Sequence, residues 1–242
     1  MVETLHGIVL NVVKYNDRNN IARIYTRERG MTAFLVPQGN TQAARRRRAL
    51  FMPLSCIAFE ARITPQRDIG TLHGTRRTTV PISITSDPVK TAIALFLGEL
   101  LTRVIVEQER NEPLYDFIEA GVNLLENTSR GIANFHICFL FHLGRFIGIQ
   151  PDTASYAPGR HFDMDEGTFV NTVPRGHHSL PPEEARVIHL LDRMTFANMH
   201  LFRFNHHERN AMLDTILAYY RLHHSALGAM RSHDVLKQLF AR

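Results

Sequence analysis

The sequence has few of the residues that hold small secreted domains together, since it contains only two cysteines, Cys56 and Cys138. Two cysteines allow one disulfide at most, and both lie in apolar runs, where a buried free thiol is common. A disulfide-rich extracellular fold is therefore excluded. We expect a protein of the reduced, cytoplasmic compartment.

Long hydrophobic runs are also missing. The most apolar stretch, residues 135–149, contains His136, His142 and Arg145, and it is too short and too polar to span a bilayer. The first residues include an early acid, Glu3, and no apolar run of signal-peptide length. The sequence therefore predicts no membrane association and no targeting signal, and it indicates that 135–149 is a buried helix.

Common enzyme motifs are absent from the sequence. It has no G-x-S-x-G, no G-x-x-x-x-G-K-[ST], no G-x-G-x-x-G and no H-E-x-x-H. Asp163, Asp165 and Glu166 form a cluster of acids, but their number and spacing do not match an EF-hand loop, so we expect solvated turn residues. The sequence predicts a protein that is not an enzyme, needs no cofactor and depends on another protein for any ATP-driven step.

Histidines are abundant, but their spacing does not favour a metal site. The chain has 14 histidines, many in adjacent pairs such as His206 and His207. Adjacent residues on a helix diverge by about 100°, whereas metal ligands converge, as they do four positions apart on one helix face. His161 with His177 or His178 would flank a loop site, but no cysteine joins them. We expect no bound metal.

Positive charge is concentrated in the first third of the chain. Residues 1–80 contain 13 Lys and Arg against 5 Asp and Glu, whereas the rest of the chain contains 15 against 18. Each phosphate that a Lys or Arg neutralises releases a condensed counterion, which favours association of a polyanion with a basic region. The asymmetry therefore indicates a polyanionic partner for the first 80 residues.

The same 80 residues have the pattern of a small β-domain. Short segments rich in β-branched and aromatic residues alternate with turn signals such as Arg29-Gly30. Five strands are predicted, over residues 8–15, 21–26, 31–36, 54–61 and 69–77. Five strands in a segment of this length match an OB-fold barrel, which we predict for residues 1–80.

Helical periodicity begins after Ser86, where Asp87 suits an N-cap and Pro88 the first helical position. Helices are predicted over about 88–105, 113–125, 132–146, 206–223 and 232–240, with another that starts at 181–182. Residues 150–180 are rich in Pro and Gly and contain a predicted hairpin, 162–169, with Glu166 and Gly167 in its turn. We therefore predict an α+β protein: an N-terminal OB-fold β-barrel, then a helical domain, 81–242, with a small hairpin lobe at about 150–180.

A run of four arginines, 45–48, lies in the connection between the third and fourth predicted strands. Adjacent guanidiniums repel one another and favour an anionic partner, and arginine donors match phosphate oxygens bidentately. We expect the run to project from the rim of the barrel, as a phosphate contact or as a solvated loop without a specific role. The predicted DNA-binding residues are Lys14, Arg23, Arg27, Arg29, Arg45, Arg46, Arg47, Arg48, Arg62, Arg76 and Arg77, with Arg67 in the same domain.

Four aromatic residues lie among these basic positions. An aromatic side chain on a barrel face can stack a base, which is worth roughly 1–3 kcal/mol. We expect Phe34 and Phe59 to fill the barrel core, while Tyr15 and Tyr25 are open to either role. In the helical domain, a groove between helices would suit a short peptide. Arg145 is the candidate to pair with the carboxylate of such a peptide, or else it is a surface residue.

The order of several short segments resembles the RecO family. The opening Gly7-Ile8-Val9-Leu10, followed by Tyr15, Asp17, Ile21, Thr26 and Gly30, is similar to the start of these proteins, as is Gly39 followed by the arginine run and Pro53-Leu54. Further similar pieces are Phe139-Leu140-Phe141-His142-Leu143-Gly144 with Pro151, Phe162-Asp163 with Gly167 and Phe169, Tyr220-Arg221-Leu222-His223, Met230-Arg231-Ser232 and Val235-Leu236. The resemblance spans nearly the whole chain.

The resemblance implies an N-terminal OB fold and a helical C-terminal domain. It also implies that the protein binds single- and double-stranded DNA and anneals complementary strands during the repair of DNA damage and recombination. Its implied partners are RecR and the acidic C-terminal tail of single-stranded DNA-binding protein, and the outcome is loading of the RecA recombinase. Many RecO proteins carry four zinc-binding cysteines in the region that is here 150–180, and this chain has none there, so we expect packing to hold that lobe.

Two other interpretations remain open. One is an OB-fold RNA-binding module, which would require contacts to the 2′-hydroxyl group. The other is a hydrolase with its site in residues 150–180, which would require a pocket with perturbed acids or histidines.

Overall fold

The computed structural model describes residues 2–64, 68–105, 108–174 and 178–240. The chain forms two compact units. Unit 1 comprises Met1–Asn127 with Met230–Leu236, and unit 2 comprises Thr128–Ala229 with Lys237–Arg242. Unit 1 therefore contains helices in addition to the β-domain. The domain boundary at residue 80 follows the last strand of that β-domain and stays a prediction.

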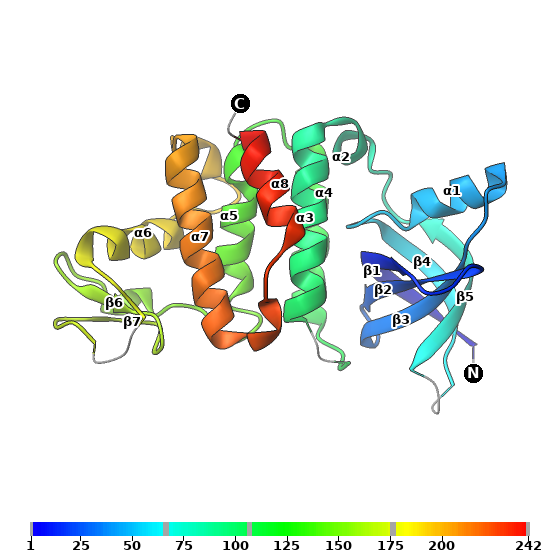
Figure 1. The fold of residues 1–242 in the computed structure, drawn as a ribbon, viewed down its shortest axis with the longest axis horizontal. Coiled ribbons are helices and arrows are strands. Elements are labelled where there is room, and N and C mark those ends of the chain that lie inside the picture. Colours follow the sequence, from blue (N-terminus) through cyan, green and yellow to red (C-terminus); the bar gives the residue numbers. More distant parts are fainter. Residues whose placement is uncertain (1, 65–67, 106–107, 175–177, 241–242) are drawn as a thin grey trace. The chain divides into compact units, whose positions relative to one another are not determined.

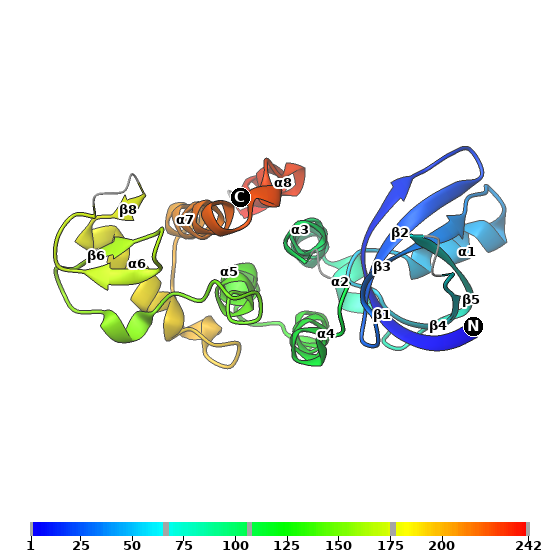
Figure 2. The same cartoon turned by 90° about the horizontal axis from the view of Figure 1, so that it is seen from below.

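The first part of unit 1 is the expected five-stranded barrel, which closes in the order β1-β2-β3-β5-β4 (Figures 1 and 2). All of its neighbouring strands pair antiparallel except β3 and β5, which pair parallel. The strands are β1 (Val2–Lys14), β2 (Asn19–Thr26), β3 (Gly30–Pro37), β4 (Cys56–Arg62) and β5 (Ile69–Arg77). The prediction of an N-terminal OB-fold barrel is confirmed. Strand β1 begins at Val2, six residues before its predicted start, because residues 2–7 pair with β4.

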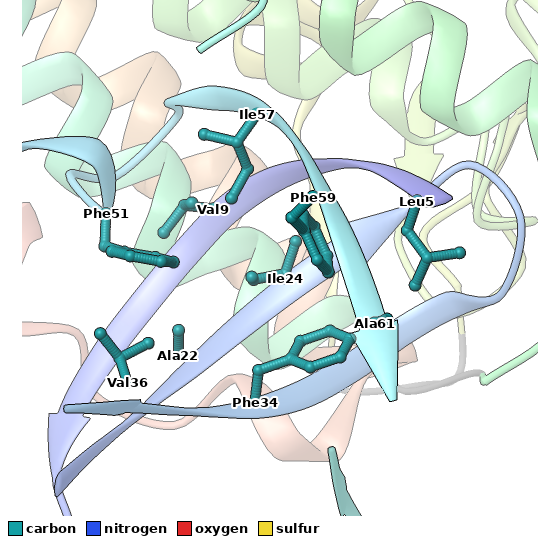
Figure 3. Packing of buried hydrophobic residues seen from close by; sticks show 10 residues of the cluster. All are labelled: Leu5, Val9, Ala22, Ile24, Phe34, Val36, Phe51, Ile57, Phe59 and Ala61. Atoms are coloured by element: carbon teal, nitrogen blue, oxygen red, sulfur yellow. The ribbon is translucent and has the colours of Figure 1, made fainter. Parts of the chain in front are cut away.

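The barrel core is built from alternating residues of the strands, as a period of two requires, together with Phe51 from the end of the helix at Gln42–Leu50. It contains Leu5, Val9, Ala22, Ile24, Phe34, Val36, Phe51, Ile57, Phe59 and Ala61 (Figure 3). The rings of Phe34 and Phe59 meet edge to face with centroids 5.0 Å apart. Both side chains are buried, so the expectation that they fill the core is confirmed.

Among the described residues, four complete helices belong to unit 1: one lies between β3 and β4 in the chain, and three follow β5. The arginine run, expected in a connection, is part of α1 (Gln42–Leu50) between β3 and β4. The other helices are α2 (Ile82–Ser86), α3 (Pro88–Val104) and α4 (Glu112–Asn127). Asp87 caps α3 as expected, because its Oδ1 accepts hydrogen bonds from the backbone of Val89 and Lys90 at 2.8 and 3.2 Å.

Helix α3 packs closely on the barrel at Gly98. A Cβ atom at this position would lie 2.5 Å from the carbonyl oxygen of Leu10 in β1. The next residue, Glu99, accepts hydrogen bonds from the backbone N–H groups of Arg231 and Ser232 at 3.3 and 3.0 Å. These residues begin α8 (Arg231–Phe240), so a carboxylate of α3 supplies the N-terminal cap of the last helix.

Unit 2 is helical, with a small sheet inserted. Its helices are α5 (Ile132–Leu143), α6 (Pro182–Asp192) and α7 (His206–His223), with short 3₁₀ turns at Thr153–Ser155, Met199–Leu201 and Ser225–Leu227. Helix α7 starts with a capping box formed by Asn205 and Glu208. The buried hydroxyl of Tyr220 donates to the Leu140 carbonyl at 2.6 Å, which fixes α7 on α5.

The lobe at 150–180 contains the expected hairpin, made of β6 (His161–Asp163) and β7 (Thr168–Val170), with β8 (Ser179–Leu180) as a third strand. Asp163 accepts from the backbone of Asp165 and Glu166 and so stabilises the turn. The rings of Phe162 and Phe169 lie 5.0 Å apart, and Phe162 also contacts Tyr219 of α7 at 5.9 Å. Aromatic packing therefore holds this lobe on the helices.

Candidate nucleic-acid interface

Helix α1 carries four exposed guanidiniums, Arg45 to Arg48. The hydroxyl of Thr41 accepts from the Ala44 N–H at 3.2 Å and caps the helix. The positions three and four residues before and after the run hold no Asp or Glu, so α1 supplies no carboxylate to these arginines. None of the four guanidiniums has a hydrogen bond or ion pair with a described residue. Their charge therefore faces solvent without compensation.

Two hydrogen bonds bring further basic residues to this end of the barrel. Arg77 of β5 donates from Nη2 to the Ala49 carbonyl at the end of α1. The Gln38 N–H, just before α1, donates at 2.7 Å to the carbonyl of Arg18 in the β1–β2 turn. We call the resulting set the α1 surface, which comprises Lys14, Arg18, Arg45, Arg46, Arg47, Arg48 and Arg77. Among the described residues, the one ion pair of this surface joins Lys14 to Asp17 at 3.3 Å, and both side chains are highly exposed, so the pair is weak.

The opposite end of the barrel, around the β2–β3 turn, also holds arginines of the predicted set, but two of them are paired with acids. Arg27 donates to Asp116 of α4, lies 3.5 Å from a Glu119 oxygen and covers the ring of Tyr115 at 4.6 Å. Arg29 lies 2.6 Å from the carboxylate of Glu3. Because their charges are compensated within unit 1, these two are the least suited of the set to bind phosphate.

The remaining predicted residues lie elsewhere on the barrel. Arg23 points outward from the middle of β2, Arg62 ends β4, and Arg76 is exposed one residue before Arg77. None of the three has a side-chain ion pair with a described residue. Arg67 lies outside the described residues. The predicted set is thus divided between the α1 surface, the paired β2–β3 end and three other positions.

The outer face of β2 and β3, where OB folds commonly bind oligonucleotides, carries a cleft. Its volume is about 750 Å³, and its lining includes Arg23, Met31, Ala33, Thr102 and Arg110. The cleft combines three arginines with apolar walls, but its lining also includes Glu28 and Asp68, and Arg29 and Arg110 are paired with Glu3 and Glu112. Sequence reasoning missed Arg110 and Thr102, because both come from the helical part of unit 1 and carry no motif.

The two tyrosines with an open role differ in exposure. Tyr25 is buried, stacks on Tyr115 with centroids 6.3 Å apart and donates to the Asn111 carbonyl at 3.3 Å. It is a structural residue. Burial, followed by the nearby Glu119 charge, raises the pKa of Tyr115. Tyr15 is 58% exposed in the β1–β2 turn and is available to a base next to the α1 surface.

The predicted peptide site and metal candidates lie in unit 2. Arg145 is exposed after α5. Its chain neighbour Gly144, with Phe141, Ile149 and Tyr219, lines a small apolar pocket that Arg145 itself does not line. His178 contacts Asp165 at 3.1 Å, and His177 lies outside the described residues. The described residues contain no group of three or more His, Cys, Asp or Glu that could hold a metal ion.

The two cysteines are buried and unlinked. Burial raises the pKa of Cys56 and of Cys138 to about 12, with a smaller contribution from Glu119 at Cys56. Neither thiol is therefore suited to nucleophilic or metal chemistry. Within the part of the chain that the structure describes, no helix has the length and apolarity that a membrane span needs.

Comparisons with known proteins agree with a barrel followed by a helical region. Residues 1–78 match the family model described as recombination protein O N terminal, and residues 85–228 match that described as recombination protein O C terminal. The DNA repair protein RecO of Phocaeicola vulgatus is 39% identical over 100% of both chains. Those of Bacteroides fragilis and Porphyromonas gingivalis are 40% and 34% identical over 99% of this chain and 100% of theirs.

Proposed function

Since the chain belongs to the RecO family and has a role in DNA repair and recombination, we propose that it acts there by binding DNA through the α1 surface. The observation that carries this proposal is the four arginines of α1, which are exposed and lack carboxylate partners among the described residues. Phosphate oxygens are the anions that such guanidiniums match best. Because phosphates are the same in every sequence, this surface would bind single and double strands without sequence preference.

We propose strand annealing as the consequence of this binding. Complementary strands repel each other through their phosphates, and a surface that neutralises phosphates lowers the repulsion between two strands held near it. Annealing by this route requires no catalytic residue. Any ATP-driven step of recombinase loading would be carried out by other proteins.

The decisive test removes the four charges of α1. The variant Arg45→Ala, Arg46→Ala, Arg47→Ala, Arg48→Ala is titrated with fluorescent DNA, single-stranded and duplex, at several salt concentrations. Each lost phosphate contact should lower the slope of log K against log[salt] by about 1, so we expect the slope to fall by up to about 4. Annealing of complementary oligonucleotides should slow in parallel.

A matched control removes the same charge from unit 2. Arg186, Arg193, Arg203 and Arg221 are exposed, and changing all four to Ala leaves the α1 surface intact. We expect the control to keep the wild-type slope. If both variants lose affinity equally, binding follows net charge and the α1 surface is not the site. An RNA strand of the same sequence as competitor tests the alternative of an RNA-binding module, which predicts stronger competition by RNA than by DNA.

We also propose the partners that the family resemblance implies, RecR and the acidic tail of single-stranded DNA-binding protein. The small apolar pocket lined by Gly144 supports the second, because the next residue in the chain, Arg145, is exposed and could pair with a peptide carboxylate. Calorimetry with the tail peptide should give binding that Arg145→Ala weakens, whereas Arg186→Ala should have no effect. An unchanged affinity of the Arg145 variant would remove this residue from the site.

A further inference from the structure

Unit 1 has a second concave surface beside the cleft on β2 and β3. It lies between the barrel, α3 and the first residues of α8, with a volume of about 540 Å³. Arg23 and Thr102 line both this cavity and the cleft on β2 and β3, so the two hollows are neighbours. We call the second cavity the Arg23 groove. Its lining is Leu10, Asn11, Arg23, Pro53, Ala92, Leu95, Glu99, Thr102, Arg103, Arg231, Ser232 and Val235.

Three guanidiniums from three distant parts of the sequence meet in the Arg23 groove. Arg23 comes from β2, Arg103 from the last turn of α3, and Arg231 from the start of α8. Arg103 is paired with Glu99 at 2.5 Å. Arg23 and Arg231 have no side-chain ion pair or hydrogen bond with a described residue. The groove therefore has two uncompensated positive charges, and its one acid is already bound to Arg103 and to the α8 N-terminus.

The walls of the groove are apolar and remain open to solvent. Leu95 and Val235 are 45% and 51% exposed, although both are large aliphatic side chains in helices. Pro53 and Leu10 line the same hollow. The absence of a Cβ at Gly98 allows α3 to lie close to the Leu10 carbonyl of β1, so the helix side and the strand side of the groove are in close contact. The groove is thus a built cavity of unit 1 that offers both charge and apolar surface.

This combination suits an unpaired strand better than a duplex. A duplex hides the faces of its bases in the stack and presents phosphates outward, whereas a single strand exposes phosphates and base faces together. Apolar side chains can pack against the faces of unstacked bases, and guanidiniums can bind phosphates or stack on bases. The α1 surface consists of basic side chains, which suit the phosphates of either form.

We propose that the Arg23 groove is a second DNA site, selective for single strands, and that one chain holds two DNA molecules at once, one on the α1 surface and one in the groove. This inference rests on the proposed function, since it assigns the second strand of the annealing reaction to a place in unit 1. With two sites, one strand can stay bound while its complementary strand binds next to it. The two strands then do not compete for one site.

The test uses the full-length protein and the double variant Arg23→Ala, Arg231→Ala. Both side chains are exposed, and the backbone cap between Arg231 and Glu99 remains, so the fold should be retained. The matched control is Arg186→Ala with Arg193→Ala in unit 2. A short biotinylated duplex on beads captures the protein, and a fluorescent oligothymidine, which cannot pair with this duplex, reports the second site.

For the wild type and the control we expect the captured protein to recruit oligothymidine. The groove variant should be captured normally but recruit roughly tenfold less, with the salt slope for oligothymidine lowered by about 2. The quadruple α1 variant should fail at capture while it still binds oligothymidine in solution. Recruitment by the groove variant at the wild-type level would overturn the second site and leave the proposed function standing. If the wild-type protein binds no DNA of either form, the proposed function itself fails.

Discussion

The two ends of the barrel use the same residue type in opposite ways. At the end covered by α1, four arginines face solvent without acids, whereas at the β2–β3 turn Arg27 and Arg29 are paired with Asp116, Glu119 and Glu3. Counting positive charges in the sequence does not distinguish the two ends, because both carry arginines. The comparison teaches that the carboxylates brought by the fold, more than the number of arginines, decide which end is free to bind an anion.

The largest loss of stability is expected from Tyr115→Ala. This residue lies at the β2–β3 end of the barrel, where Arg27 and Arg29 are paired with acids; we call it the paired end. Tyr115 is buried, stacks on Tyr25 and lies beneath the Arg27 guanidinium. Removing a buried aromatic ring costs about 3–5 kcal/mol through lost burial and the cavity left behind. We expect urea unfolding to show this loss, while the salt slope of DNA binding at a permissive temperature stays that of the wild type. A changed slope with unchanged stability would mean that the paired end binds DNA.

The architecture could be predicted from the sequence to a large extent. Alternating β-branched residues and turn signals located the five strands, and Asp87-Pro88 located the start of α3. The sequence does not predict helix α1, because a run of four arginines has no apolar periodicity. Its flanking residues, Ala43, Ala44, Ala49 and Leu50, are strong helix formers and carried the missing signal. Helix α2 and strand β8 have five and two residues, too few for a periodicity to be recognised.

The candidate site could be predicted only in part. The arginine run is contiguous, so composition alone identified it. The pairing of Arg27 with Asp116 joins residues that the sequence keeps 89 positions apart, and no local pattern indicates it. The same holds for Arg103 and Arg231, which the fold brings to Arg23 in one groove. A run of charged residues can be identified from the sequence. Whether acids neutralise those charges depends on contacts between distant residues, which form only in the folded chain.

A smaller loss of stability is expected from Glu99→Ala. This variant removes the carboxylate that pairs with Arg103 and caps α8 in the Arg23 groove. Burial on its own raises the pKa of Glu99, but hydrogen bonds from Ser232 and the charge of Arg103 outweigh it, so the pKa lies below its usual value. The carboxylate therefore adds stability that is present above the pKa of the unfolded chain and is lost as the pH falls through the lower, folded value. The Ala variant should lose about 1 kcal/mol of unfolding free energy at neutral pH, as for a removed helix cap, and less in acid.

The same substitution, Glu99→Ala, should strengthen DNA binding although it lowers stability. Without Glu99, the Arg103 guanidinium loses the acid that compensates it in the groove, so oligothymidine should bind more tightly and with a steeper salt slope, while duplex binding is unchanged. Fluorescence anisotropy at several salt concentrations measures both. The isosteric Glu99→Gln variant is the control for packing, since it removes the charge and keeps the shape. Weaker oligothymidine binding in both variants would contradict the assignment of the groove.

The smallest effect is expected from Arg27→Ala, which breaks the paired end directly. The Arg27 side chain is 34% exposed and that of Asp116 57%, so solvent screens much of the pair, and the cation–π contact with Tyr115 is partly open. Together these contacts should contribute about 1 kcal/mol or less to stability. DNA affinity should change little, because Asp116 and Glu119 already neutralise this arginine.

A single α1 substitution such as Arg46→Ala is the matched comparison: it should leave urea unfolding unchanged and lower the salt slope by about 1. The reverse result, a fall in slope for Arg27→Ala and none for Arg46→Ala, would show that carboxylate pairing does not decide which end of the barrel meets DNA.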